Sequence, residues 1–84
     1  MDNEYIKYDE LPNGTILNGI DSIWDEEYLI KLNDNEACYS IKCNSVEKCE
    51  VCNVFLNSYG YYYFVLNNKS IIPITKKYYK EVKQ

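Results

Sequence analysis

The chain has 84 residues and a net charge of −4 at neutral pH, from 13 acidic and 9 basic side chains. A chain of this length has room for one core, so we expect a single domain over residues 1–84. All the basic residues are lysines, and neither His nor Arg occurs. Without a side chain that titrates near neutrality or a bidentate phosphate clamp, the commonest catalytic designs are excluded. We therefore predict a protein that binds and is not an enzyme.

The first part of the chain is predicted to form an arm, a turn and a strand. Residues 1–10 are polar with isolated aromatic side chains, which is typical of a flexible N-terminal arm or a short edge strand. They open with acid and lead into no apolar run, so no secretory signal is expected there. Leu11 to Gly14 has the composition of a turn. Thr15 to Trp24 is rich in β-branched and aromatic residues and predicts a strand, bent at Gly19.

A hairpin is predicted next. After the acidic break at residues 25–27, Tyr28 to Leu32 alternates with its even-numbered residues on one face. Asn33 to Glu36 predicts the hairpin loop, and Ala37 to Lys42 predicts the returning strand. Cys43 to Cys49 is expected to be a connection.

Three further strands are predicted over Glu50 to Asn57, Tyr61 to Leu66 and Ser70 to Ile74. Asn57 to Gly60 and the pair Asn67-Asn68 have the composition of the turns between them, because Gly and Asn tolerate positive φ. Pro73 marks the last strand as an edge, since proline cannot donate to a ladder.

Residues 75–83 are predicted to form a C-terminal helix. Thr75 is a typical capping residue, and Ile74, Tyr78 and Val82 recur at i, i+4 and i+8. So short a helix must dock on the sheet to be stable. The predicted fold class is therefore mostly β (α+β), a small twisted antiparallel sheet or small barrel of five to six strands with one short C-terminal helix.

Four cysteines fall within fifteen residues with the spacing C-x4-C-x5-C-x2-C: Cys38, Cys43, Cys49 and Cys52. A hairpin closed over residues 43–49 would place Ser40 opposite Cys52 and Cys43 opposite Cys49, with Cys38 and Cys52 on one face and the other two on the second. A tetrahedral zinc site cannot accept that division. We expect no cofactor and ordinary reduced thiols, with a structural zinc knuckle or a Cys43–Cys49 disulfide as the alternatives.

The predicted contact surface combines acids with tyrosines. Ten tyrosines supply large, rigid contact area with a polar tip. Residues 1–50 hold 12 acids and 4 lysines, a balance of −8, whereas residues 51–84 hold 1 acid and 5 lysines, a balance of +4. The acidic half suits a partner with a basic surface. The candidate partner-binding residues are Asp21, Asp25, Glu26, Glu27, Asp34, Glu36, Tyr61 and Tyr63.

These features predict a protein-binding module, a small acidic inhibitor of the phage type that covers a basic, nucleic-acid-binding surface of a host defence enzyme. Asn, Lys, Ile and Tyr are frequent, and all four are encoded by A/T-rich codons, which indicates an A/T-rich genome. The expected compartment is the cytoplasm of a low-GC bacterial host. One alternative is direct nucleic-acid binding through Lys76, Lys77, Tyr78, Lys80 and Lys83. Others are a β domain that sequesters a nucleotide-like small molecule, a zinc-knuckle adaptor, and assembly as a homodimer. No membrane-spanning run is present, since the longest apolar stretch is Tyr61 to Leu66.

Overall fold

The computed structural model describes residues 4–20, 25–43 and 46–82. Within them, seven antiparallel strands form one sheet in the order β6-β5-β4-β3-β2-β1-β7. The strands in chain order are β1 (Ile16–Ile20), β2 (Asp25–Asn33), β3 (Glu36–Cys43), β4 (Val46–Leu56), β5 (Tyr62–Val65), β6 (Ile71–Pro73) and β7 (Tyr79–Glu81). A short 3-10 helix, η2 (Tyr8–Glu10), precedes β1. The mostly β prediction is confirmed, with more strands than expected.

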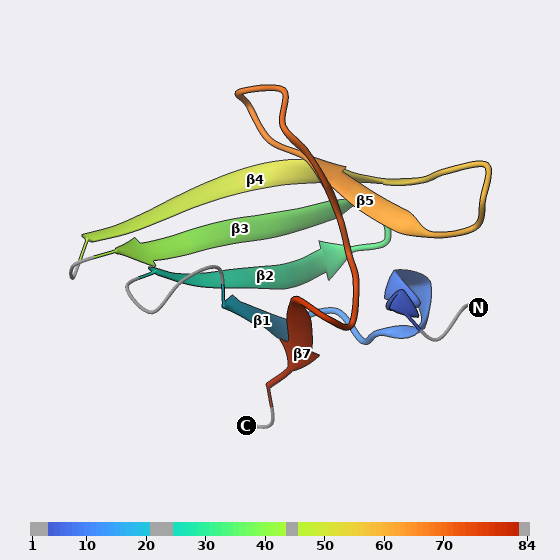
Figure 1. Ribbon diagram of the computed structural model, residues 1–84, viewed down its shortest axis with the longest axis horizontal. Coiled ribbons are helices and arrows are strands. Elements are labelled where there is room, and N and C mark those ends of the chain that lie inside the picture. Colours follow the sequence, from blue (N-terminus) through green and yellow to red (C-terminus); the bar gives the residue numbers. More distant parts are fainter. Residues whose placement is uncertain (1–3, 21–24, 44–45, 83–84) are drawn as a thin grey trace.

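The sheet curls into a half-barrel (Figure 1). Phe64 on β5 and Tyr79 on β7 are separated in the sheet order by β4, β3, β2 and β1, yet their ring centroids lie 6.1 Å apart. Tyr39 on β3 lies 5.4 Å from the same Phe64 ring. Strands so far apart in one sheet can touch only if the sheet bends around its own side chains. The core is therefore the concave face of the curl.

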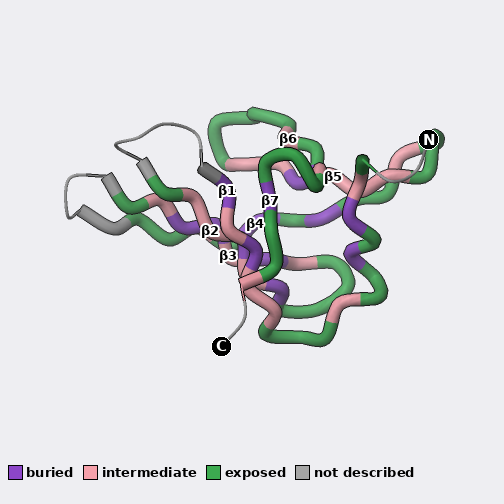
Figure 2. The backbone as a smooth tube through the Cα atoms, turned by 60° about the horizontal axis from the view of Figure 1, so that its bottom comes forward, coloured by how far each residue is buried: buried purple, intermediate pink, exposed green. Residues whose placement is uncertain are grey.

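Side-chain alternation decides which residues enter that core. Leu17, Leu29, Tyr39, Val54 and Phe64 come from five neighbouring strands, and each is at most 5% exposed. Their sequence neighbours point to the outer face and are more exposed, except Ser40, which is buried at 3%. Figure 2 shows buried positions on the central strands and exposed ones on the hairpin loops. The even-numbered residues of 28–32, expected to share a face, therefore face outward, and the core takes Leu29 and Lys31 instead.

Two of the predicted turns are three-residue loops that return the chain through a left-handed position. Gly60 has φ +92° and donates its N–H to the Asn57 carbonyl at 3.1 Å. At the next loop Lys69 has φ +71° and donates to the Leu66 carbonyl at 2.9 Å. This is the type I turn with a bulge that commonly joins antiparallel strands. The turn at Asn67-Asn68 is where it was predicted, but the positive φ falls on the lysine that follows.

The predicted register of β3 and β4 is wrong. The loop is shorter than residues 43–49, because β4 already begins at Val46, opposite Cys43. Ser40 therefore lies opposite Cys49 in place of Cys52, and Cys38 lies opposite Val51. A register change by an odd number of residues moves side chains to the other face. The proposed pairing of Cys43 with Cys49 does not form in this ladder.

The predicted C-terminal helix is also wrong. A single turn of the chain is closed by a hydrogen bond of 3.0 Å from the Tyr79 N–H to the Thr75 carbonyl. From Tyr79 the chain is extended and forms β7. β7 pairs with β1, with Tyr79 opposite Gly19. A Cβ atom on Gly19 would lie 2.9 Å from the Tyr79 ring and 2.8 Å from the Tyr78 carbonyl oxygen. The glycine predicted to bend the strand instead makes room for a buried tyrosine, and burial of that ring favours the strand over a helix too short to be stable alone.

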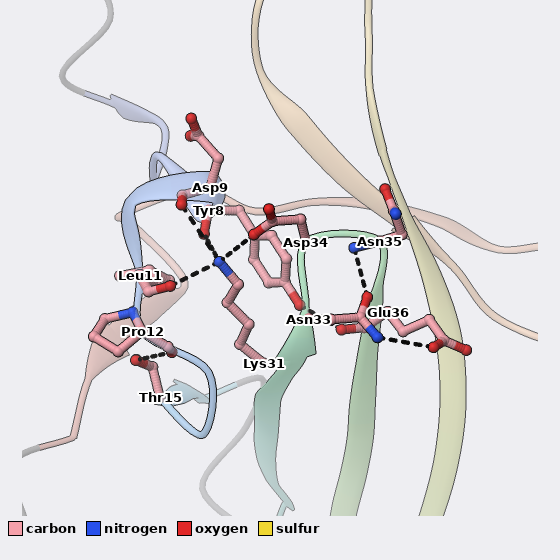
Figure 3. Close-up of polar contacts among 10 residues, drawn as sticks. All are labelled: Tyr8, Asp9, Leu11, Pro12, Thr15, Lys31, Asn33, Asp34, Asn35 and Glu36. Carbon is pink, nitrogen blue, oxygen red and sulfur yellow. Dashed lines mark hydrogen bonds and ion pairs between the residues drawn. The ribbon is translucent and has the colours of Figure 1, made fainter.

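Residues 4–10 of the predicted flexible arm are docked on the sheet by a buried lysine (Figure 3). The Lys31 side chain is 2% exposed, and its ammonium donates to the carbonyls of Tyr8 at 2.9 Å and Leu11 at 2.7 Å. The Asp34 carboxylate also binds the Lys31 ammonium, in an ion pair of 2.8 Å. Tyr8 is the first residue of η2 and Leu11 follows its last, so the ammonium binds the carbonyl groups of this short helix and its C-cap residue. The arm also pairs with the C-terminal segment, because the Ile6 N–H donates to the Ile74 carbonyl at 3.1 Å.

Candidate functional site

The acids predicted to bind a partner are dispersed over the fold. Glu26 and Glu27 are neighbours on β2 and therefore point to opposite faces. The Tyr28 hydroxyl donates to Glu26 at 2.7 Å, and the Tyr79 hydroxyl donates to Glu27 at 3.3 Å from the concave side. At the other end of β2, Asp34 is ion-paired with Lys31, and Glu36 accepts from the Asn33 amide at 3.0 Å. Asp21 and the side chain of Asp25 lie outside the described residues.

The two candidate tyrosines stack on other aromatic rings. Tyr61 lies 4.3 Å from Tyr5 of the arm, with the planes at 11°. Tyr63 lies 5.5 Å from Phe55, with the planes at 30°. Both tyrosines are half-buried. Because Phe64 faces the core, Tyr63 and Phe55 lie on the outer face of the sheet.

The outer face carries an apolar surface that the sequence analysis did not identify. Its most exposed members are Ile71 at 66%, Val51 at 58% and Phe55 at 44%. The ladder registers join them to apolar neighbours, which are half-buried except for the exposed Pro73. One row runs through Ile16, Ile30, Cys38 and Val51, and others join Val65 to Ile71 and Tyr63 to Pro73. We call this set the outer apolar face. The signal was present in Tyr28 to Leu32, whose apolar side chains were grouped correctly but face away from the core.

Lysines of the alternative nucleic-acid set border a cleft between the arm and β7. The cleft measures about 790 Å³ and is lined by Tyr5, Ile6, Lys7, Glu10, Leu11, Leu17, Lys76, Tyr79, Lys80 and Glu81. Lys77 and Tyr78 border an adjoining cleft of about 590 Å³ that shares Tyr5 and Lys76 with the first. Because the segment after Thr75 extends into β7 and does not form the predicted helix, Lys76 and Lys80 border this cleft together with the arm. Lys83 lies outside the described residues.

The three cysteines with described side chains are free thiols on two faces of the sheet. Cys38 and Cys49 share the outer face, whereas Cys52 is 4% exposed in the core. Burial, with the negative charge of Glu50 nearby, raises the pKa of Cys52 to about 11. Burial and the neighbouring Cys49 also raise the pKa of Cys38. The side chain of Cys43 is outside the described residues.

That placement differs from the prediction, in which Cys38 shared a face with Cys52. Ligands of one tetrahedral metal must converge on a point, and thiols on opposite faces of a strand do not. Among the residues with described side chains, no group of three His, Cys, Asp or Glu is positioned to hold a metal.

The fold and these surfaces define a small antiparallel β domain, curled into a half-barrel, with an apolar outer face. No protein-family model, curated protein or solved structure matches the chain. In the described residues, no helix has the length and apolar character needed to cross a membrane.

Proposed function

We propose that this chain is a protein-binding module whose contact surface is the outer apolar face. The observation that supports the proposal most directly is the exposure of Val51 and Phe55 on β4 and of Ile71 on β6, which lie on one sheet face with β5 between the two strands. Contiguous exposed apolar surface of this kind marks interaction sites in small proteins. The stacked pair Phe55 and Tyr63 supplies the aromatic anchor typical of interface centres.

The character of the partner follows from the rim of this surface. Glu26 and Glu36 lie on the same outer face at its two ends, because their strand neighbours Glu27 and Ala37 face the core. With the net charge of −4, they favour a partner that has an apolar patch bordered by basic residues. A basic, nucleic-acid-binding surface of a host enzyme has this character, and covering it would inhibit the enzyme.

Capture from a low-GC bacterial lysate tests the proposal when it is combined with matched variants. Phe55→Ser and Ile71→Ser replace outer-face side chains that are already partly exposed, so they should leave the fold intact. Both should abolish capture of the same enriched protein. Tyr59→Ser is the control, because Tyr59 is 88% exposed in the loop between β4 and β5 and is not part of a strand of that face. Equal capture by all the variants, or recovery of nucleic acid alone, would contradict the proposal.

The lysine-bordered cleft favours a second candidate function, the binding of an anionic ligand such as single-stranded nucleic acid. Lys7, Lys76 and Lys80 line it together with the exposed side of the stacked Tyr5 ring, and bases stack on such rings. Glu10 and Glu81 reduce its positive charge, which makes this the weaker candidate. Salt-sensitive binding of single-stranded DNA or RNA, lost in Lys76→Glu/Lys80→Glu, would support it.

A further inference from the structure

Strand β4 is longer than the strand that covers it. β5 pairs only with Asn53 to Leu56, so β4 has no neighbour on that side from Val46 to Cys52 among the described residues (Figure 1). On its other side, β3 pairs with every position from 46 to 53. An unpaired strand of this length presents a row of backbone donors and acceptors to another chain.

The direction of those backbone groups can be derived from the bonds on either side. The Val54 N–H donates toward β3, to the Asn35 carbonyl at 2.8 Å, and the Asn57 N–H donates toward β5, to the Tyr61 carbonyl at 3.0 Å. Successive residues of a strand donate to opposite sides, and the β3–β4 register is unbroken from 53 to 46. The open edge therefore presents the N–H and C=O groups of Glu47, Cys49 and Val51.

The charges along this edge are self-complementary in one register only. Two copies can pair antiparallel about a two-fold axis with their concave faces on the same side of the joined sheet. Directly opposed residues then lie on the same face, so an even-numbered residue faces an even-numbered one and an odd-numbered residue faces an odd-numbered one. An axis at Lys48 would oppose two lysines, and an axis at Glu50 would oppose two glutamates. An axis at Cys49 places Lys48 of each copy opposite Glu50 of the other. The Asn67 N–H donates to the Glu50 carboxylate and holds it at the edge, and a carboxylate accepts several further donors.

We propose that the protein forms a homodimer by antiparallel pairing of β4 with β4 of a second copy, centred on Cys49. The two Cys49 residues exchange N–H···O=C bonds at the axis. Lys48 and Glu50 of the other copy face each other at a non-hydrogen-bonded position, where side chains approach most closely. The result is one continuous sheet in which the two outer apolar faces lie on the same side, with Cys49 of both copies between them and the exposed Val51 of each copy opposite position 47 of the other. The dimer is independent of the partner proposed above.

Sedimentation of the full chain from micromolar to millimolar concentration tests the assembly. We expect a reversible doubling of molar mass, and a monomer throughout that range would overturn the proposal. Lys48→Glu opposes like charges at both symmetric positions and should weaken dimerisation roughly tenfold. The exchange Lys48→Glu/Glu50→Lys restores opposite charges and should restore the dimer. Far-UV circular dichroism verifies that each variant is folded. A dimer that tolerates Lys48→Glu unchanged would contradict the register.

Two site-resolved measurements locate the axis. In a dimer, the Cys49 amide should gain protection from hydrogen exchange as concentration rises, whereas the Lys48 amide, which points to β3, should be protected at every concentration. A short bismaleimide should link two copies through Cys49, which is exposed. Linking should disappear in Cys49→Ser and persist in Cys38→Ser and Cys43→Ser. Linking that depends on Cys38 or Cys43, or Cys49 exchange independent of concentration, would overturn the proposal.

Discussion

Replacing Lys31 by methionine removes a buried cation and keeps the volume of its alkyl chain. The ammonium now donates to the Tyr8 carbonyl at 2.9 Å and the Leu11 carbonyl at 2.7 Å, and it pairs with Asp34 at 2.8 Å. Methionine donates no hydrogen bond, so the Leu11 carbonyl loses its donor, and the Tyr8 carbonyl keeps only the bond from the Leu11 N–H at 3.1 Å. The Asp34 side chain is 71% exposed and is rehydrated without a large cost.

The size of the effect follows from the carbonyls. An acceptor left without a partner inside the fold costs about 1–3 kcal/mol, which applies to the Leu11 carbonyl, and the Tyr8 carbonyl in addition loses the bond from its charged donor. Methionine recovers part of this cost, because it avoids the desolvation of an ammonium. We therefore expect a net loss of about 2–3 kcal/mol, from a total of about 4–12 kcal/mol for a domain of this length. The midpoint of thermal unfolding should fall by roughly 10–20 °C.

Urea unfolding followed by circular dichroism measures this loss, with Asp34→Asn as the matched control. Since Asp34 is mostly exposed, its substitution should cost less than about 0.5 kcal/mol. The arm should also become sensitive to proteases in Lys31→Met, because the Tyr8 and Leu11 contacts that hold it are gone. The reasoning is refuted if Lys31→Met is as stable as the wild type, or if Asp34→Asn is equally damaging.

Three further predictions concern the core and the turns. Gly19→Ala should destabilise the domain by about 1–3 kcal/mol and expose β7 to hydrogen exchange, because the new Cβ would overlap Tyr79; unchanged exchange in β7 would contradict this. The pKa of Cys52 is about 11 in the fold against 9.0 for an unperturbed thiol, so the unfolded chain loses its proton first. Its stabilising contribution is complete below pH 9 and is lost as pH rises to 11, so Cys52→Val should show a shallower alkaline fall in urea midpoint. Gly60→Ala should cost about 1–2 kcal/mol, because alanine is strained at φ +92° although nothing crowds the site; thermal melts that coincide with the wild type would contradict it.

The sequence was informative where local chemistry decides structure. Asn57 to Gly60 and Asn33 to Glu36 were predicted as turns, and both are turns, because their residues favour such backbone wherever they occur. The alternation around them was sufficient to predict an antiparallel sheet. These features depend on neighbours within a few positions, which a single sequence contains.

The errors arose where distant residues decide. The repeat of Ile74, Tyr78 and Val82 fits a helix, but Tyr78 is 51% exposed, and the buried ring is that of Tyr79 on Gly19. No local signal shows that Lys31 is buried, because the carbonyls that bind its ammonium lie twenty or more positions earlier. For the candidate surface, Tyr63 was identified from composition, but its neighbours on the outer face follow from the ladder register, which no single strand specifies.

The two ends of the described chain are joined in a way that affects how the molecule acquires its shape. Glu4 and Lys76 share a backbone hydrogen bond of 2.8 Å, and β7 lies beside β1. The strands β2, β3 and β4 are consecutive and can pair as soon as they are made, but closure of the curl depends on residues some seventy positions apart. Such contacts are slow to form, because a long loop must close before any of them is gained. During synthesis, the central meander would therefore form first, with Phe64 and Leu17 still uncovered. Lys31 can already hold Tyr8 and Leu11 at that stage, whereas Glu4 and Ile6 would lack their partners until Ile74 and Lys76 have left the ribosome.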